Sequence, residues 1–110
     1  MAAGPQPQIA EALKLLWLKF LPQVHERVAV LQEASSALEA GSLSDEQRTA
    51  AGAAAHKLAG VLGTFGLANG TSLARKAEEI YTSDSPLDSA AAARIGVITK
   101  QLADLVETHL

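Results

Sequence analysis

The chain has 110 residues, a net charge of −3 and a hydrophobic content of 48%, which fits one compact domain. Disulfide scaffolds and cysteine-ligated zinc are excluded because there is no cysteine, and nine Lys and Arg against twelve Asp and Glu argue against a nucleic-acid-binding domain. The longest apolar stretch, Leu15–Leu21, is too short to cross a membrane, so we expect a cytoplasmic protein.

Residue usage favours helix throughout the chain. There are 22 Ala and 16 Leu, whereas Val and Ile together contribute ten residues. Residues 1–8 contain Pro5 and Pro7 and lack apolar periodicity, so we interpret them as a disordered lead-in to a domain covering residues 9–110.

The first predicted helix begins at Ile9 and continues to about Leu38. Pro22 divides it, and either kinks one long helix or starts a second one at its first position. Gly41 is well placed to follow the helix end. The apolar residues predicted to face inward are Leu13, Leu16, Trp17, Phe20, Val24, Val28, Leu31 and Leu38.

The second helix is predicted to begin after Ser44, because Gln47 three residues later completes a capping box. Gly66 is suited to end this helix. Its predicted inward face, at spacings of three and four residues, consists of Ala51, Ala54, Ala55, Leu58, Val61, Leu62 and Phe65.

Two further helices complete the predicted fold. Residues 69–72 mark a turn or the frayed start of a third helix that carries Leu73, Ala77, Ile80 and Tyr81 inward. The fourth helix is predicted to take Ser85 as its cap, with Pro86 in the first turn and Asp88 three residues on. Its apolar stripe consists of Leu87, Ala91, Ile95, Ile98, Leu102 and Leu105. We therefore expect an all-α fold, an up-down antiparallel four-helix bundle with an additional or kinked N-terminal helical segment.

One histidine is predicted to face out of this bundle. At 100° per residue, His56 lies roughly 160° from Leu58, the centre of the apolar face of the second helix. Three outward glycines in a helix interior cost on the order of 2–3 kcal/mol, which folding alone does not require. The small residues predicted on this side are Gly52, Ala53, Ala59, Gly60 and Gly63. They indicate clearance for a molecule that approaches His56 closely.

The imidazole of His56 is partly neutral at cytoplasmic pH, and its ring nitrogen is then a usable nucleophile or base. No Ser, Cys or Asp lies three or four residues away to form a local triad. Lys57 and Arg48 are candidates to contact an anion or an acidic partner, whereas Glu78 is interpreted as a surface charge. This pattern is typical of half a site that another protein completes.

The segment from His56 to Leu67, continuing through Leu73, Ala77, Glu78 and Ile80, resembles the signature of histidine-containing phosphotransfer (HPt) domains of bacterial multistep phosphorelays. The resemblance implies that His56 accepts a phosphoryl group from a receiver-domain phospho-aspartate and passes it to another receiver. It matches Gly60, Gly63 and Gly66 to family glycines and puts Ala59 where many members carry Lys.

The same resemblance implies response-regulator receiver domains and a hybrid histidine kinase as partners. It implies no kinase or hydrolase activity and no cofactor, since Mg²⁺ belongs to the receiver. We expect a monomer that binds neither nucleic acid nor membrane, with Lys57, Gly60, Gly63 and Arg48 at the docking surface. The alternative is a non-phosphorylated helical adaptor or dimerisation module that uses the small-residue face around Gly60; a self-contained hydrolase lacks a second catalytic group near His56.

Overall fold

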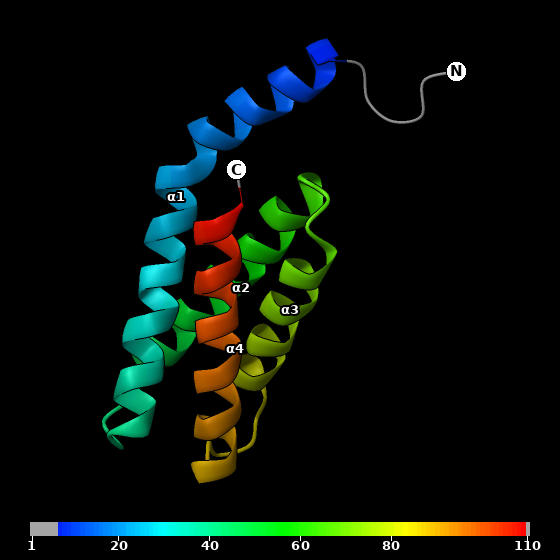
Figure 1. The fold of residues 1–110 in the computed structure, drawn as a ribbon. Coiled ribbons are helices and arrows are strands. Elements are labelled where there is room, and N and C mark those ends of the chain that lie inside the picture. Colours follow the sequence, from blue (N-terminus) through cyan, green and yellow to red (C-terminus); the bar gives the residue numbers. More distant parts are fainter. Residues whose placement is uncertain (1–6, 110) are drawn as a thin grey trace.

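The computed structural model describes residues 7–109, and these residues form four α-helices and no strand (Figure 1). Each helix packs against two neighbours, so that α1 contacts α2 and α4, and α3 completes the ring between α2 and α4. Short loops join consecutive helices, which therefore run antiparallel. The helices are α1 (Pro7–Glu39), α2 (Asp45–Thr64), α3 (Ala68–Thr82) and α4 (Ser89–Thr108). This architecture confirms the predicted all-α four-helix bundle.

Local sequence signals define most helix ends. The Ser44 side chain accepts from the Gln47 backbone, and the Gln47 side chain accepts from the Ser44 backbone, so the predicted capping box is present. Gly41 and Gly66 follow α1 and α2 with positive φ angles of 73°, a conformation that favours glycine. The predicted cap of α4 was wrong: Asp88, not Ser85, is its N-cap and accepts from the Ala91 backbone at 2.8 Å. The third helix begins at residue 68, so residues 69–72 are helical and do not form a turn.

α1 is one continuous helix with Pro22 inside it, which confirms the first of the two alternatives. Its N-terminal part projects past the end of the bundle (Figure 1), where it has no neighbouring helix to pack against. Leu13 and Leu16 are therefore 43% and 39% exposed, and their predicted burial was wrong. Residues 7 and 8 of the expected lead-in belong to α1, and residues 1–6 lie outside the described residues.

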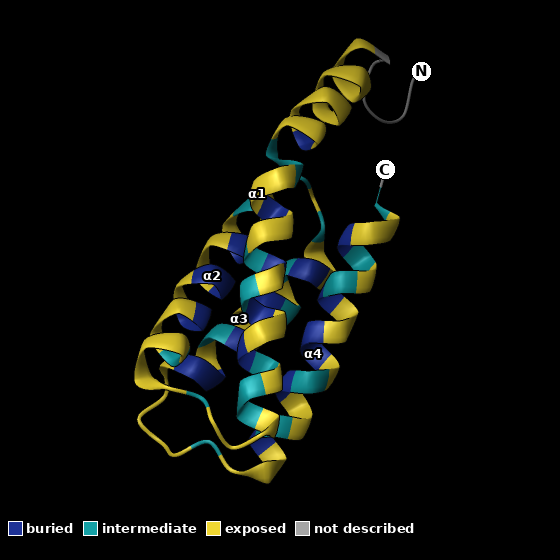
Figure 2. Cartoon of the chain, turned by 90° about the vertical axis from the view of Figure 1, so that its left-hand side faces the viewer, coloured by how far each residue is buried: buried dark blue, intermediate teal, exposed yellow. Residues whose placement is uncertain are grey.

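The core runs along the axis of the bundle, as the buried positions in Figure 2 show. Leu58, Leu62, Ile95 and Leu102 are fully buried and come from α2 and α4. Trp17 closes one end of this core and is 2% exposed, and its ring lies edge-on to Phe65 with the centroids 5.2 Å apart. Of the helices described, none has the length and apolar character needed to cross a membrane.

Candidate functional site

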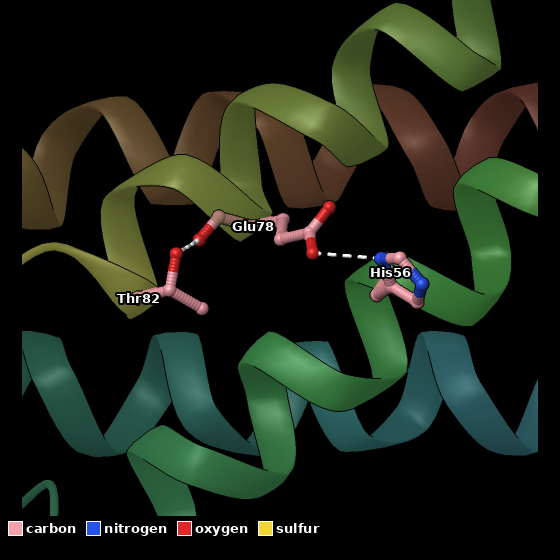
Figure 3. Close-up of polar contacts among 3 residues, drawn as sticks. All are labelled: His56, Glu78 and Thr82. Carbon is pink, nitrogen blue, oxygen red and sulfur yellow. Dashed lines mark hydrogen bonds and ion pairs between the residues drawn. The ribbon is translucent and has the colours of Figure 1, made fainter.

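His56 lies near the middle of α2, and its side chain is 74% exposed. The imidazole Nδ1 is 2.8 Å from Glu78 Oε2 on α3 (Figure 3). Nδ1 therefore carries the proton that is donated to this carboxylate. The other ring nitrogen, Nε2, has no hydrogen-bond partner among residues 7–109, and in the neutral ring it is the nitrogen with the lone pair.

Glu78 is the candidate site residue that the sequence did not reveal, since it was interpreted as a surface charge. Its side chain is 29% exposed and contacts His56 on α2, so it is not a free surface charge. Next to it, Thr82 Oγ1 donates to the Glu78 backbone carbonyl at 2.7 Å, which supports the last turn of α3 (Figure 3). The contact between Glu78 and Nδ1 fixes both the tautomer and the orientation of the His56 imidazole.

The surface beside His56 is bare on the side of Gly60. A Cβ atom added at Gly60 meets nothing within 4 Å, and one added at Gly63 meets only Thr71 Oγ1 at 3.4 Å. Both glycines are exposed, as the sequence predicts. One turn after the histidine, a partner can therefore approach the helix backbone closely.

Two small residues were placed on the wrong side of α2. Gly52 is buried, and a Cβ atom there would lie 2.9 Å from Thr82 Cγ2, so this glycine allows α2 and α3 to pack closely. Ala59 is only 5% exposed, and its carbonyl accepts from Thr71 Oγ1 at 3.3 Å. Because α2 packs against both α1 and α3, its buried arc is wider than one apolar stripe suggests.

The two predicted docking cations differ in their surroundings. Lys57 is exposed beside His56. In contrast, the Arg48 guanidinium donates to the carbonyls of Tyr81, Ser83 and Ser85 at 2.8, 2.6 and 3.0 Å. Arg48 thus ties the start of α2 to the loop after α3, and these contacts do not support the docking role predicted for it.

The remaining histidines lie away from His56. His25 is exposed on α1, and the His109 ring lies edge-on to Trp17 with the centroids 4.8 Å apart. Within residues 7–109 no three His, Asp or Glu side chains come together in a way that could hold a metal ion. His56 is thus the histidine that combines an exposed ring, a carboxylate partner and a bare neighbouring surface.

A helical bundle that presents one oriented, exposed imidazole is the arrangement expected of a phosphoryl carrier. The chain matches the family described as Hpt domain over residues 15–108, and it therefore belongs to that family. Hpt domains are phosphotransfer carriers of phosphorelays, and they work with receiver domains and histidine kinases.

The chain is also similar to a curated protein. Over 73 residues the chain is 36% identical to Protein RcaC of Microchaete diplosiphon. The match covers 66% of this chain and 11% of that protein, so the chain corresponds to a small part of the relative's length. No solved structure matches the chain.

Proposed function

We propose that His56 is the phosphoacceptor of this Hpt domain. Its Nε2 accepts a phosphoryl group from an aspartyl phosphate of a receiver domain and returns it to the aspartate of another receiver. The observation that carries this proposal is the exposed ring, held at Nδ1 by Glu78 and open at Nε2.

In the proposed transfer, Nδ1 of His56 carries the proton and Nε2 is the attacking atom. The Nε2 lone pair attacks phosphorus, the bond between phosphorus and the aspartate oxygen breaks, and the carboxylate leaves with the bonding electrons. The ring gains positive charge as the N–P bond forms, and the Glu78 carboxylate, 2.8 Å from Nδ1, offsets that charge. In the reverse step the imidazole is the leaving group and becomes neutral again.

In our proposal the receiver domain supplies the groups for phosphoryl transfer that this chain does not provide. It brings the aspartate and the Mg²⁺ ion, while this chain contributes a positioned nitrogen and a surface that allows close approach. Gly60 and Gly63 leave that surface open, and exposed Lys57 is suited to meet acidic groups of the receiver. The chain is then a carrier without kinase or hydrolase activity, and a hybrid histidine kinase is one source of the phosphoryl group.

Label transfer tests this proposal. A receiver domain phosphorylated with ³²P is mixed with the chain, and the labelled residue is identified after digestion under alkaline conditions, in which phosphohistidine survives. We expect the wild-type chain to be labelled and His56→Gln to carry no label. His25 is an exposed histidine of α1, and the control His25→Gln is labelled like the wild type. Label that persists in His56→Gln contradicts the proposal.

One observation favours association as a second candidate function. The projecting part of α1 exposes Ile9, Leu13, Leu15, Leu16 and Leu18, each at least 39% accessible, whereas a helix with so many apolar positions is usually covered. This arm of α1 exposes large apolar side chains, whereas the face around Gly60 exposes small residues, so the arm is the better surface for such a role. Analytical ultracentrifugation of the wild-type chain and of Leu13→Ser/Leu16→Ser decides between the expected monomer and a dimer formed through the arm.

A further inference from the structure

A phosphoryl group on His56 creates a charge problem, because α2 carries exposed Lys57 beside His56 but no cation one turn further along the helix. The group adds about 1.5 to 2 negative charges. The Glu78 carboxylate, 2.8 Å from Nδ1 of the same ring, is a second negative group near it. The α2 residues one turn further on are Ala59 and Gly60, so neither provides a cation there. A compensating charge on this side therefore has to come from a neighbouring helix.

The contacts between α2 and α3 show which α3 residue lies at that position. Three pairs fix the antiparallel register: Gly52 with Thr82, His56 with Glu78, and Gly63 with Thr71. Arg75 precedes Glu78 by three residues, just as Ala59 follows His56 by three. Counted from the last pair, Arg75 is four residues after Thr71, and Ala59 is four before Gly63. Both counts place Arg75 opposite Ala59.

The surroundings of Arg75 leave its guanidinium available. Arg75 is exposed and forms no ion pair within the described part of the chain. It lines a hollow together with Gly63 and Thr71, and the charged residues Lys76 and Glu79 line the same hollow. Lys76 lies about 100° further round α3 and also lines the hollow between α3 and α4, so it is less well directed toward His56.

We propose that Arg75, reaching across from α3, supplies the positive charge that faces a phosphoryl group on His56. This inference rests on the proposed function, because it concerns the phosphorylated form of that histidine. A guanidinium is suited to the task, since its planar N–H groups bind phosphoryl oxygens in pairs and remain charged at all relevant pH values.

The test uses the small donor phosphoramidate, so that it needs no receiver. The full chain is phosphorylated, and the last ionisation of the phosphoryl group is followed by ³¹P NMR as a function of pH. A nearby cation favours the dianion, so we expect Arg75→Gln to raise the midpoint by about half a pH unit, a roughly threefold change in the ionisation constant. Arg75→Lys keeps the positive charge, so we expect its midpoint to lie close to that of the wild type. In 1 M salt the difference between the wild type and Arg75→Gln becomes smaller.

Arg94→Gln is the matched control, because Arg94 is also exposed but lies on α4, in the hollow next to Lys76. We expect its midpoint to equal that of the wild type. A midpoint for Arg75→Gln that also equals the wild-type value overturns the role of Arg75 while leaving His56 as the acceptor. If phosphoramidate labels His56 but receivers do not, the proposed relay fails and the charge pairing is still measured. If His56 is labelled neither by phosphoramidate nor by a receiver, both the proposed relay and the role of Arg75 fail.

Discussion

Replacing Gly60 by Leu separates the stability of α2 from the accessibility of His56. A Cβ atom at Gly60 meets nothing within 4 Å, so the new side chain extends from the surface without displacing a neighbour. Leu is favoured over Gly in a helix interior by about 0.8 kcal/mol. For a domain of this size, that gain raises Tm by roughly 3–6 °C. We therefore expect Gly60→Leu to be more stable than the wild type.

Phosphoryl transfer responds in the opposite direction. Residues four apart on a helix have Cβ atoms about 5–6 Å from each other, so the Leu side chain stands where a receiver must approach His56. A misplacement of about 1 Å between reacting groups can lower a rate roughly a hundredfold, and we expect a loss of at least about tenfold. The measurements are Tm by circular dichroism and the initial rate of label transfer from a phosphorylated receiver.

Gly96→Leu on α4 is the control, because a Cβ atom added there also meets nothing within 4 Å. It gives a similar gain in stability, and we expect transfer at the wild-type rate. Wild-type transfer by Gly60→Leu would show that the bare surface beside His56 does not serve the approach of a partner. A lower Tm for Gly60→Leu would show that this face of α2 is not open.

Three further predictions concern α2 and α3. Glu78→Gln keeps an acceptor for Nδ1 but removes the charge, so transfer slows by about three- to tenfold while Tm changes little, and equal rates in Glu78→Gln and Glu79→Gln would contradict this role. Gly52→Ala forces a Cβ atom to within 2.9 Å of Thr82 Cγ2 and lowers the free energy of unfolding by about 1–2 kcal/mol, which chemical denaturation measures and Thr82→Ser partly restores; a stabilised Gly52→Ala would refute the close packing. Burial raises the pKa of Tyr81 to about 12 from 10.0, so the folded chain keeps a proton that the unfolded chain loses, and stability is unchanged below pH 10 and falls between pH 10 and 12. Since Tyr81 is the single tyrosine, phenolate absorbance reports this ionisation directly, Tyr81→Phe removes the alkaline loss, and a midpoint near 10 in the folded chain contradicts the prediction.

The helices were predictable because their end signals are local. The capping box at Ser44 and the glycines at positions 41 and 66 act within a few residues, and each was found where the sequence indicates. The start of α4 was misplaced by a few residues, because Ser85 and Asp88 are both good caps and only the geometry of the loop decides between them. Burial of Leu13 and Leu16 was predicted wrongly, since periodicity does not reveal that α1 is longer than its partners.

The candidate site was predictable only in part. The outward position of His56 follows from its angle to Leu58, which lies within the same helix. The contact with Glu78 joins residues that are 22 positions apart, and no local pattern indicates which α3 carboxylate faces the ring. The α2 sequence is so rich in Ala and Gly that it distinguishes poorly between a packing glycine such as Gly52 and an exposed one such as Gly60.

The most direct measurement of the central claim is the position of phosphorus on the histidine ring. The chain is labelled with ¹⁵N-histidine, phosphorylated by a receiver domain and studied by ³¹P and ¹H–¹⁵N NMR. Because Glu78 holds Nδ1 and leaves Nε2 open, we expect the phosphorus on Nε2 of His56. Phosphorus bonded to Nδ1, or found on His25 or His109, would contradict the account.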